Sequence, residues 1–496
     1  MSRPSAARRA DLVRIAVETM AERGLEPEFP AAALRQLASI NAPGTAADPR
    51  IVDLRAMPWC SIDNDDSRDL DQLTTCEPLA DGSVRIHVAI ADVDVLVEKD
   101  SPIDEHARVN TTSVYTAARI FPMLPERLST DLTSLNPGED RLALVTDFVV
   151  AADASIAQSG VHRAKVHNHA KLAYDAVAAW LDGAAALPAT AAAVAGMEQQ
   201  LRTQDSVAQR LRARRRAEGA LEFETLQPRA VYEGERVVEI RQQVQNRARQ
   251  LIEELMIATN QCTARYLSRQ GGISLRRVVR SPERWQRIAE VARRFGEALP
   301  MEPDARALED FLARRRKADP LRFPDLSLVI VKLMGSGEYV VEAAGVAPVG
   351  HFGLALRDYT HSTAPNRRFP DLITSRLLKS VLAGSVPPYS LTELSALAAH
   401  CSRQEDAAQK VERKLRKSEA ALLLQSRVGE RFDAIVTGRA KGNTWVRTFA
   451  PPVEGMLAGR VPELDIGQRV RVELVATDVE RGFIDFALVE RVRDRS

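Results

Sequence analysis

The acidic segment between residues 61 and 72 constrains the fold more than any other part of the chain. It reads Ser-Ile-Asp-Asn-Asp-Asp-Ser-Arg-Asp-Leu-Asp-Gln and places five aspartates between two apolar, strand-like runs. Carboxylates this close repel one another, so a fold that gathers Asp63, Asp69 and Asp71 needs a divalent cation or protons to hold them. In an extended backbone Asp69 and Asp71 point to one side and Leu70 to the other. The segment therefore predicts a site for a hard cation such as Mg²⁺.

Two other interpretations of this segment have to be weighed. The aspartates fall at the alternate positions of a calcium-binding EF-hand loop, but such a loop needs Gly at position six and Glu at position twelve. The chain has Arg68 and Thr74 there. The second interpretation is a solvated acidic turn with no ligand, which is common for isolated charge runs.

The motifs after the aspartates favour the metal site. In order they are residues 84–92 (VRIHVAIAD), 112–115 (TSVY), 121–129 (FPMLPERLS), 134–141 (SLNPGEDR), 171–174 (KLAY), 222–224 (EFE), 252–260 (IEELMIATN) and 361–369 (HSTAPNRRF). This order resembles the catalytic domain of the ribonuclease II and ribonuclease R family, hydrolytic exoribonucleases that shorten RNA from its 3′ end. The resemblance runs from about Asp48 to the C-terminus, and so many ordered motifs make it specific.

The resemblance implies a catalytic metal and raises one question about it. Asp63, Asp69 and Asp71 occupy the family's carboxylate positions, which implies Mg²⁺, with Mn²⁺ as the alternative ion. Gln72 stands where the family has a fourth aspartate. A neutral amide is a weaker ligand, so metal affinity should fall unless a water or Asp66 fills the position. Gln72 therefore leaves open a catalytically impaired, RNA-binding protein.

Two arginines follow from the same resemblance. In Thr-Ala-Pro-Asn-Arg-Arg-Phe the first arginine, Arg367, corresponds to the family residue that contacts the scissile phosphate, and Arg368 is expected to bind RNA. A guanidinium group there can stabilise charge that develops on the phosphoryl oxygens. Asn366 and Phe369 depart from the family's Ile and Tyr. A purely structural salt bridge is the alternative role of Arg367.

An exonuclease that ignores sequence can hold its substrate by stacking bases on aromatic rings. By resemblance, Tyr115 and Phe223 would sandwich the terminal bases, and Tyr174 would act near the last phosphate or the metal. Glu254 matches a family acid close to the terminal nucleotide. The neighbouring Glu253 faces another way on a helix, which makes the pair testable.

Composition agrees with a large enzyme. The chain has 496 residues and 45% hydrophobic content, enough for about three domains. Its four cysteines show no Cys-x-x-Cys spacing, and we find neither a signal peptide nor an apolar run that would span a bilayer. We therefore expect a cytoplasmic protein without a membrane segment. The net charge is only +1, and basic runs at 210–216, 276–280 and 314–317 are more typical of solvated helix faces than of RNA sites.

The expected fold class is α+β, with a mixed α/β catalytic domain at residues 48–424. Residues 1–47 carry two helical patterns, one ending near Gly24 and one from Pro30 to about Ile40, which are helix-turn-helix-like or a packing cap. Helices are predicted at 247–269 and within 391–424, and the alanine-rich stretch 184–195 as a helix-rich loop. Residues 427–496 predict an OB fold of the ribosomal S-one type, with strands at 431–436, 444–449, 459–461, 469–474 and 482–489.

In this barrel Trp445, Arg447 and Phe449 alternate along one strand and could present an aromatic ring and a cation to a base. A core position for Trp445 is the alternative.

The sequence thus predicts a monomeric, metal-dependent 3′-to-5′ exoribonuclease that releases nucleoside 5′-monophosphates from RNA with a free 3′ end. Apart from the impaired RNA-binding protein, a helix-turn-helix regulator is the remaining alternative. It is disfavoured because residues 30–40 contain one basic residue, Arg35. The family's N-terminal cold-shock-type OB domains are missing from this sequence, which predicts a wider entrance and digestion closer to duplex RNA.

Overall fold

The computed structural model describes residues 9–224, 228–234, 236–242, 245–343, 348–440, 442–459, 461–464 and 466–492. The first eight and last four residues of the predicted terminal domains lie outside this range. A seven-stranded sheet forms the centre of the catalytic region, with strand order β1-β8-β7-β4-β3-β2-β9. Its strands are β1 (Val52–Asp53), β2 (Cys60–Asp63), β3 (Gln72–Pro78), β4 (Val84–Ala91), β7 (Asp140–Val150), β8 (Ile156–His167) and β9 (Ala170–Ala173).

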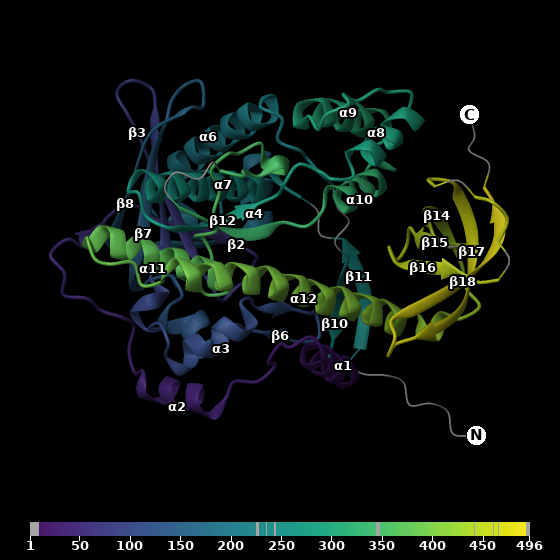
Figure 1. Cartoon of the computed structure of the whole chain (residues 1–496), viewed down its shortest axis with the longest axis horizontal. Helices are drawn as coiled ribbons and strands as arrows, with labels where there is room; N and C mark the ends of the chain where they lie inside the picture. The colour runs from purple at the N-terminus through teal and green to yellow at the C-terminus, as the bar shows by residue number, and fades with distance from the viewer. Residues whose placement is uncertain are drawn as a thin grey trace.

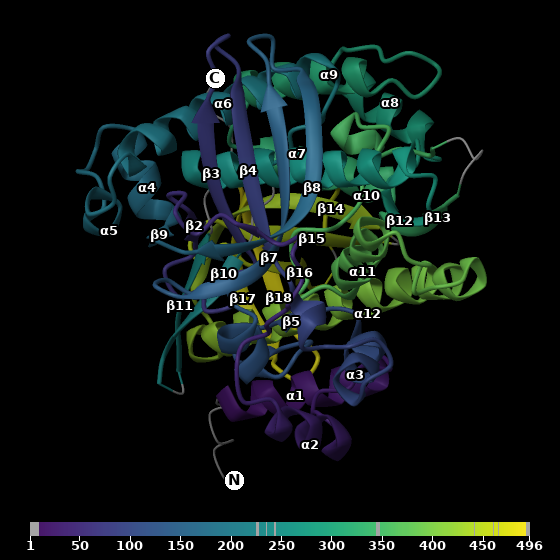
Figure 2. The same ribbon diagram turned by 90° about the vertical axis from the view of Figure 1, so that its left-hand side faces the viewer.

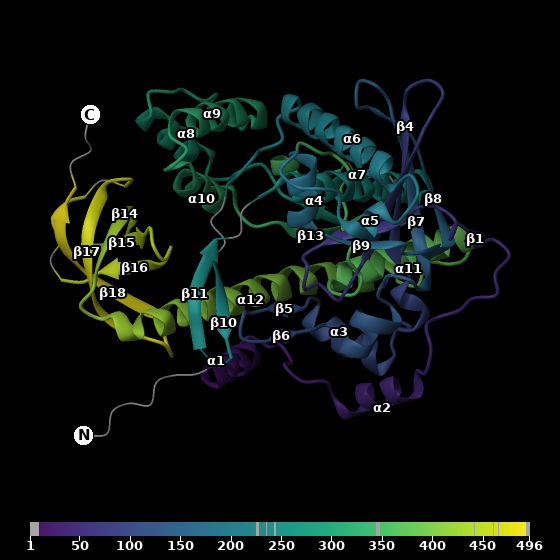
Figure 3. The ribbon, with the colours of Figure 1, turned by 180° about the vertical axis from the view of Figure 1, so that it is seen from behind.

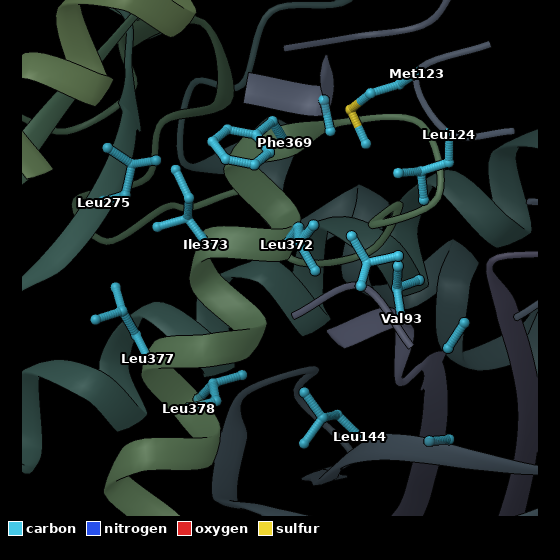
Figure 4. Close-up of a cluster of buried hydrophobic side chains, with 14 of the residues drawn as sticks. Val93, Met123, Leu124, Leu144, Leu275, Phe369, Leu372, Ile373, Leu377 and Leu378 are labelled. Atoms are coloured by element: carbon cyan, nitrogen blue, oxygen red, sulfur yellow. The ribbon is translucent and has the colours of Figure 1, made fainter. Parts of the chain in front are cut away.

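Helices cover both faces of this sheet, because its strands are apolar on both sides. One face packs against α11 (Phe369–Ala383) and the first half of α12 (Leu391–Leu424), and Figure 4 shows this core around α11. The other face packs against α6 (Met197–Ala217) and α7 (Arg247–Arg269). Figure 2 shows α7 behind the upright strands β3, β4 and β8. The sheet is therefore buried, and only its ends can carry a site.

The two long helices have the bounds that the sequence predicts. In α7 the apolar stripe Leu251, Leu255, Ala258 and Cys262 is buried in the core, and the Asn246 side chain caps the helix by accepting a hydrogen bond from the Arg249 N–H. α12 has 34 residues and, at 1.5 Å per residue, is about 50 Å long. It runs the length of the molecule, from the sheet to the C-terminal barrel (Figures 1 and 3).

The N-terminal region contains both predicted helices, α1 (Arg9–Glu22) and α2 (Ala31–Ser39), and Gly24 takes a positive φ just after α1. The helices pack against different partners. The apolar stripe of α1 lies on α12, and α2 contacts α3 (Pro102–Asn110). This arrangement agrees with the packing-cap interpretation of residues 1–47.

The C-terminal region folds as the predicted closed barrel, in the order β14-β15-β16-β18-β17. Its strands are β14 (Arg431–Ala440), β15 (Asn443–Thr448), β16 (Glu454–Leu457), β17 (Arg469–Asp478) and β18 (Phe483–Arg491). The predicted third strand at 459–461 is wrong, and residue 460 lies outside the described part of the chain.

Gly455 explains that error, because it lies inside a strand instead of marking a turn. A Cβ atom at this position would lie 2.6 Å from the Ile484 carbonyl oxygen and 2.6 Å from the Phe486 ring. Glycine therefore lets β16 approach β18 closely. In sequence it is indistinguishable from a turn glycine.

Three further parts complete the fold. The alanine-rich stretch 184–195, which follows α4 (Tyr174–Leu181), is a loop that contains the short α5 (Ala189–Ala192), in agreement with the prediction of a loop with helix in it. A unit with its own apolar core consists of α8 (Trp285–Arg294), α9 (Ala305–Ala318) and α10 (Phe323–Met334). The two-stranded pairs are β5 (Val114–Tyr115) with β6 (Ile120–Phe121), β10 (Pro228–Glu233) with β11 (Arg236–Gln242), and β12 (Ser274–Val278) with β13 (Glu338–Glu342).

The barrel is joined to the rest of the molecule by α12 and by an ion pair. Arg447 on β15 donates to both carboxylate oxygens of Asp325 on α10, at 3.2 and 2.8 Å, and both side chains are largely buried. The predicted role of Arg447 as a cation for a base is thus opposed by this pairing. β15 faces α10 at this point.

Candidate active site

The carboxylates lie at the edge where β2 ends and β3 begins. Asp63 is the last residue of β2 and accepts hydrogen bonds from the Asn64 N–H at 2.7 Å and the Ser67 hydroxyl at 2.9 Å. Lys171 on β9 supports the same turn by donating to the backbone oxygens of Asp65 and Ser67. The acidic segment is therefore a turn whose conformation is fixed by hydrogen bonds to Asp63 and from Lys171.

Leu70 fixes the orientation of its two neighbours, as the alternation predicted. Its side chain is buried in the core beneath the sheet, and its N–H donates to the Ser134 hydroxyl at 3.0 Å. Ser134 comes from one of the motifs that carried the resemblance. With Leu70 directed into the core, the carboxylates of Asp69 and Asp71 are directed away from it.

Asp71 is the most enclosed carboxylate of the site. One of its oxygens accepts a hydrogen bond from the Asn366 N–H at 2.9 Å, and the other lies 3.4 Å from Nε of Arg367. The Asn366 side chain accepts from the Thr133 hydroxyl, which holds this loop in place. The predicted catalytic residues Asp71 and Arg367 are thus brought together, although they are 296 positions apart in sequence.

Burial and mutual repulsion make this group of carboxylates hard to ionise. The pKa of Asp71 is raised to about 7, chiefly by desolvation, and the neighbouring negative charge of Asp69 contributes while Arg367 opposes the shift. Desolvation also raises the pKa of Asp69, with a smaller contribution from Asp63. A bound cation would relieve both penalties.

The donor set fits a hard divalent cation in its chemistry, since three carboxylates offer oxygen ligands. Within the part of the chain that the structure describes, no three His, Cys, Asp or Glu side chains converge as a complete metal site. Gln72 is the first residue of β3, and strand alternation turns its side chain away from that of Asp71. Its role as a ligand stays a prediction.

The two predicted tyrosines lie near different carboxylates, Tyr115 near Asp69 and Tyr174 near Asp63. The Tyr115 hydroxyl on β5 donates to Asp69 at 3.3 Å. Tyr174 is the first residue of α4, and the negative charge of Asp63 adds to the desolvation that raises its pKa. The Arg249 guanidinium lies over the Tyr174 ring, 4.5 Å from its centre, and donates to the Asn64 amide oxygen.

Arg249 is a residue that sequence reasoning missed. It stands within an ordinary helical pattern, and nothing in its spacing indicates that α7 points it at the acidic turn. Glu253 follows it by one helical turn and so shares its face. Desolvation raises the pKa of Glu253.

Three predicted RNA contacts have other partners in the structure. Arg368 forms an ion pair with Asp371 at 2.7 Å. Glu254 is buried and pairs with both Nε and Nη2 of Arg215 on α6. Phe223 is partly buried against the core of α8, α9 and α10, and among the described residues no ring contact joins it to Tyr115. Their roles in RNA binding stay predictions.

Many arginines of the basic runs form ion pairs with glutamates of the same chain. Arg212 and Arg316 pair with Glu222, Arg276 with Glu342, and Arg277 with Glu405. These pairs show that much of the positive charge in the basic runs is matched by carboxylates of the protein itself.

A cavity of ≈ 460 Å³ adjoins the carboxylates, a size suited to small ligands or a few nucleotides. It is lined by Asp69, Tyr115 and one face of α12. The cavity therefore adjoins the site at Asp69 and Tyr115, while Asp71 and Arg367 lie beside Asp69 and outside the lining.

The comparisons with known proteins agree with this geometry. Residues 51–384 match the RNB domain, and residues 430–489 match the RNase II-type exonuclease C-terminal S1 domain. The chain belongs to the RNB family. Ribonuclease R of Vibrio parahaemolyticus is 31% identical over 506 residues, covering 94% of this chain and 59% of that protein. Ribonuclease R of Escherichia coli K12 is also 31% identical, covering 89% and 58%. The chain thus spans about three fifths of the length of these RNB relatives.

Solved structures show the same fold. Mycoplasma genitalium RNase R in complex with ribose-methylated single-stranded RNA has a TM-score of 0.86 at 20% identity, covering 97% of this chain and 78% of that one. The same enzyme with double-stranded RNA has a TM-score of 0.85 at 21% identity, covering 97% and 83%. Yeast Ssd1, a pseudonuclease, has a TM-score of 0.71 at 17% identity, covering 94% and 58%. Among the described helices, none is both long and apolar enough for a transmembrane span.

Proposed function

We propose that this RNB-family protein is a metal-dependent exoribonuclease that hydrolyses RNA from its 3′ end and releases nucleoside 5′-monophosphates. The observation that carries the proposal is the pairing of Asp71 with Arg367 beside Asp69. This arrangement combines a carboxylate suited to a cation with a guanidinium suited to a phosphate. Its partner is RNA with a free 3′ end, and the protein acts on this RNA as a monomer.

Hydrolysis requires a water to attack the scissile phosphorus while the 3′ oxygen of the preceding nucleotide leaves. Mg²⁺, or Mn²⁺ in its place, held by Asp63, Asp69 and Asp71 would supply positive charge and activate the water. Arg367, which is 43% exposed, is free to turn from Asp71 to a phosphate and offset charge on its oxygens. The Asn366 N–H holds Asp71 in position, and Tyr115 orients Asp69.

The terminal nucleotide would lie between this centre and α7. Tyr174 offers a ring on that side, with its outer face already covered by Arg249. The 5′-monophosphate product follows from cleavage of the bond to the 3′ oxygen, because the scissile phosphate then stays with the released nucleotide.

A second candidate function is RNA binding without cleavage. The observation that favours it is Gln72, a weaker ligand directed away from Asp71. The structural similarity to yeast Ssd1, a pseudonuclease, shows that this fold also occurs without nuclease activity.

A time course on 5′-labelled single-stranded RNA with Mg²⁺ or Mn²⁺ separates the two functions. We expect progressive shortening from the 3′ end by the wild type. Asp71→Asn should lower the cleavage rate at least a thousand-fold, because a group that stabilises the transition state contributes about 3–4 kcal/mol or more. Asp65→Asn is the matched control, since it removes the same charge from an exposed position in the same turn. A wild type that binds RNA but cuts nothing with either metal, together with a Gln72→Asp variant that cuts, would instead establish the binding function.

A further inference from the structure

One face of α12 forms a wall of the cavity beside the site. Glu412, Arg416 and Glu419 are spaced at i, i+4 and i+7, which places them on one side of the helix, and all three line the cavity with Asp69 and Tyr115. Figure 1 shows α12 passing over β6, and β5 contacts the same helix. None of these three residues has a role in the chemistry described above.

Glu412 connects this face to the carboxylates through Tyr115. Its carboxylate accepts a hydrogen bond from the Tyr115 backbone N–H at 3.0 Å, and the hydroxyl of the same tyrosine donates to Asp69 at 3.3 Å. Tyr115 therefore links this face of α12 to Asp69, one of the proposed metal ligands. Arg416 lies one helical turn, about 5.4 Å, further along α12.

The charges of the cavity single out Arg416. The described lining residues include five carboxylates but two cations, Arg68 and Arg416. Glu412 and Glu419 are engaged, the first by Tyr115 and the second by the Tyr232 hydroxyl. Arg416 is half exposed, and the nearest carboxylate oxygen, on Glu412, is 4.0 Å away, so a phosphate oxygen could form a shorter contact.

The continuation of the cavity shows which part of an RNA strand would pass Arg416. Five of its lining residues, from the β5–β6 turn and the segment after it, also line a cavity of ≈ 850 Å³ bounded by Arg9, Phe29 and Tyr232. Arg249, which lies over the Tyr174 ring, donates to Asn64, and Asn64 lines the cavity beside α12. A strand whose 3′ end lies at Tyr174 can therefore pass Asn64 and continue through this cavity along α12.

We propose that Arg416 binds the backbone phosphate of RNA upstream of the scissile phosphate. This subsite rests on the proposed exoribonuclease function and adds a residue that holds the strand between cleavage steps. Oligonucleotides too short to reach α12 then lose this contact, so the subsite contributes to the length at which digestion stops.

The test measures binding in the Asp71→Asn background, where RNA stays intact. We expect Arg416→Ala to weaken binding of a 12-nucleotide RNA about ten-fold and to reduce the slope of log K against log salt by about one. Arg413→Ala is the matched control, because Arg413 is an exposed arginine of the same helix that does not line the cavity. Unchanged melting temperatures would show that the variants fold.

A neutral methylphosphonate placed at successive linkages locates the contact. We expect one upstream linkage at which neutralisation weakens binding by the protein with Arg416 but not by Arg416→Ala. Binding by Arg416→Ala that equals binding by Arg413→Ala, or neutral linkages that weaken both proteins alike, would overturn the proposal. If the wild type does not cut RNA, only the exoribonuclease function is overturned. The role of Arg416 is still tested, because its experiment measures binding and not cleavage.

Discussion

Glu419 shows how burial alone can make a single residue sensitive to pH. It lies on the cavity-lining face of α12, yet its side chain is buried, and desolvation raises its pKa to about 7 despite hydrogen bonds from Tyr232 and from the backbone of Ala117 and Ala118. The folded state therefore binds a proton more tightly than the unfolded chain, whose glutamate pKa is about 4.3.

We predict that this group lowers stability as the pH rises from about 4.5 to about 7, because in that window the folded state holds more protons than the unfolded state. Glu419→Gln should remove the effect and raise the free energy of unfolding by about 1–3 kcal/mol at pH 8, with a smaller gain at pH 5. Urea denaturation at both pH values measures it. The exposed Glu290→Gln should match the wild type at both, and an equal gain for the two variants would show that Glu419 has no special role.

At the residue scale, sequence reasoning found the side chains whose direction depends on local backbone geometry. Leu70 is buried in the core while its neighbours Asp69 and Asp71 face Tyr115 and Arg367, and that alternation is readable in the sequence. The partner of Glu254 was not readable, because it depends on Arg215, which α6 brings against it. Arg249 was missed for the same reason.

At the scale of elements, α1 is held by apolar contacts with α12. Leu12, Ile15, Ala16 and Met20 are buried against the middle of that helix. We predict that Leu12→Ala lowers the free energy of unfolding by about 2–4 kcal/mol, since it leaves a cavity between two packed helices. Leu34→Ala on α2 makes the same change at a half-exposed position and should cost less than about 0.5 kcal/mol. Thermal denaturation of both variants tests this, and equal losses would contradict it.

Elements were predicted well where periodicity was long. The bounds of α7 and α12 agree because both carry an uninterrupted apolar stripe. β16 was misplaced because a short strand with a glycine inside it looks like a turn. The unit of α8, α9 and α10 was not predicted as a unit, since its core forms only when three helices meet.

At the scale of the whole molecule, the ion pair of Arg447 and Asp325 connects the barrel to α10. We predict a coupling free energy of about 1–3 kcal/mol in a double-mutant cycle of Arg447→Ala and Asp325→Ala, because removal of one partner leaves the other charge buried. Each single variant should also increase the radius of gyration measured by small-angle X-ray scattering.

The exposed pair of Arg431 and Glu473 lies within the barrel and serves as control. Its coupling should stay below about 1 kcal/mol, and its variants should leave the radius of gyration unchanged. If the Arg447 variants also keep the wild-type dimensions, the other contacts of the barrel, such as those with α12 and the Arg14–Glu480 ion pair, suffice to position it.

Gly455 has a consequence for how this chain can vary between organisms. Any other residue there would place an atom within 2.6 Å of the Ile484 carbonyl oxygen, which belongs to the backbone and cannot turn aside. A library of random variants selected for intact protein should therefore retain glycine at 455 while accepting asparagine at 71. The same library selected for RNA decay should reject substitutions of Gly455 and also Asp71→Asn. The two selections together would therefore separate residues needed for folding from residues needed for activity.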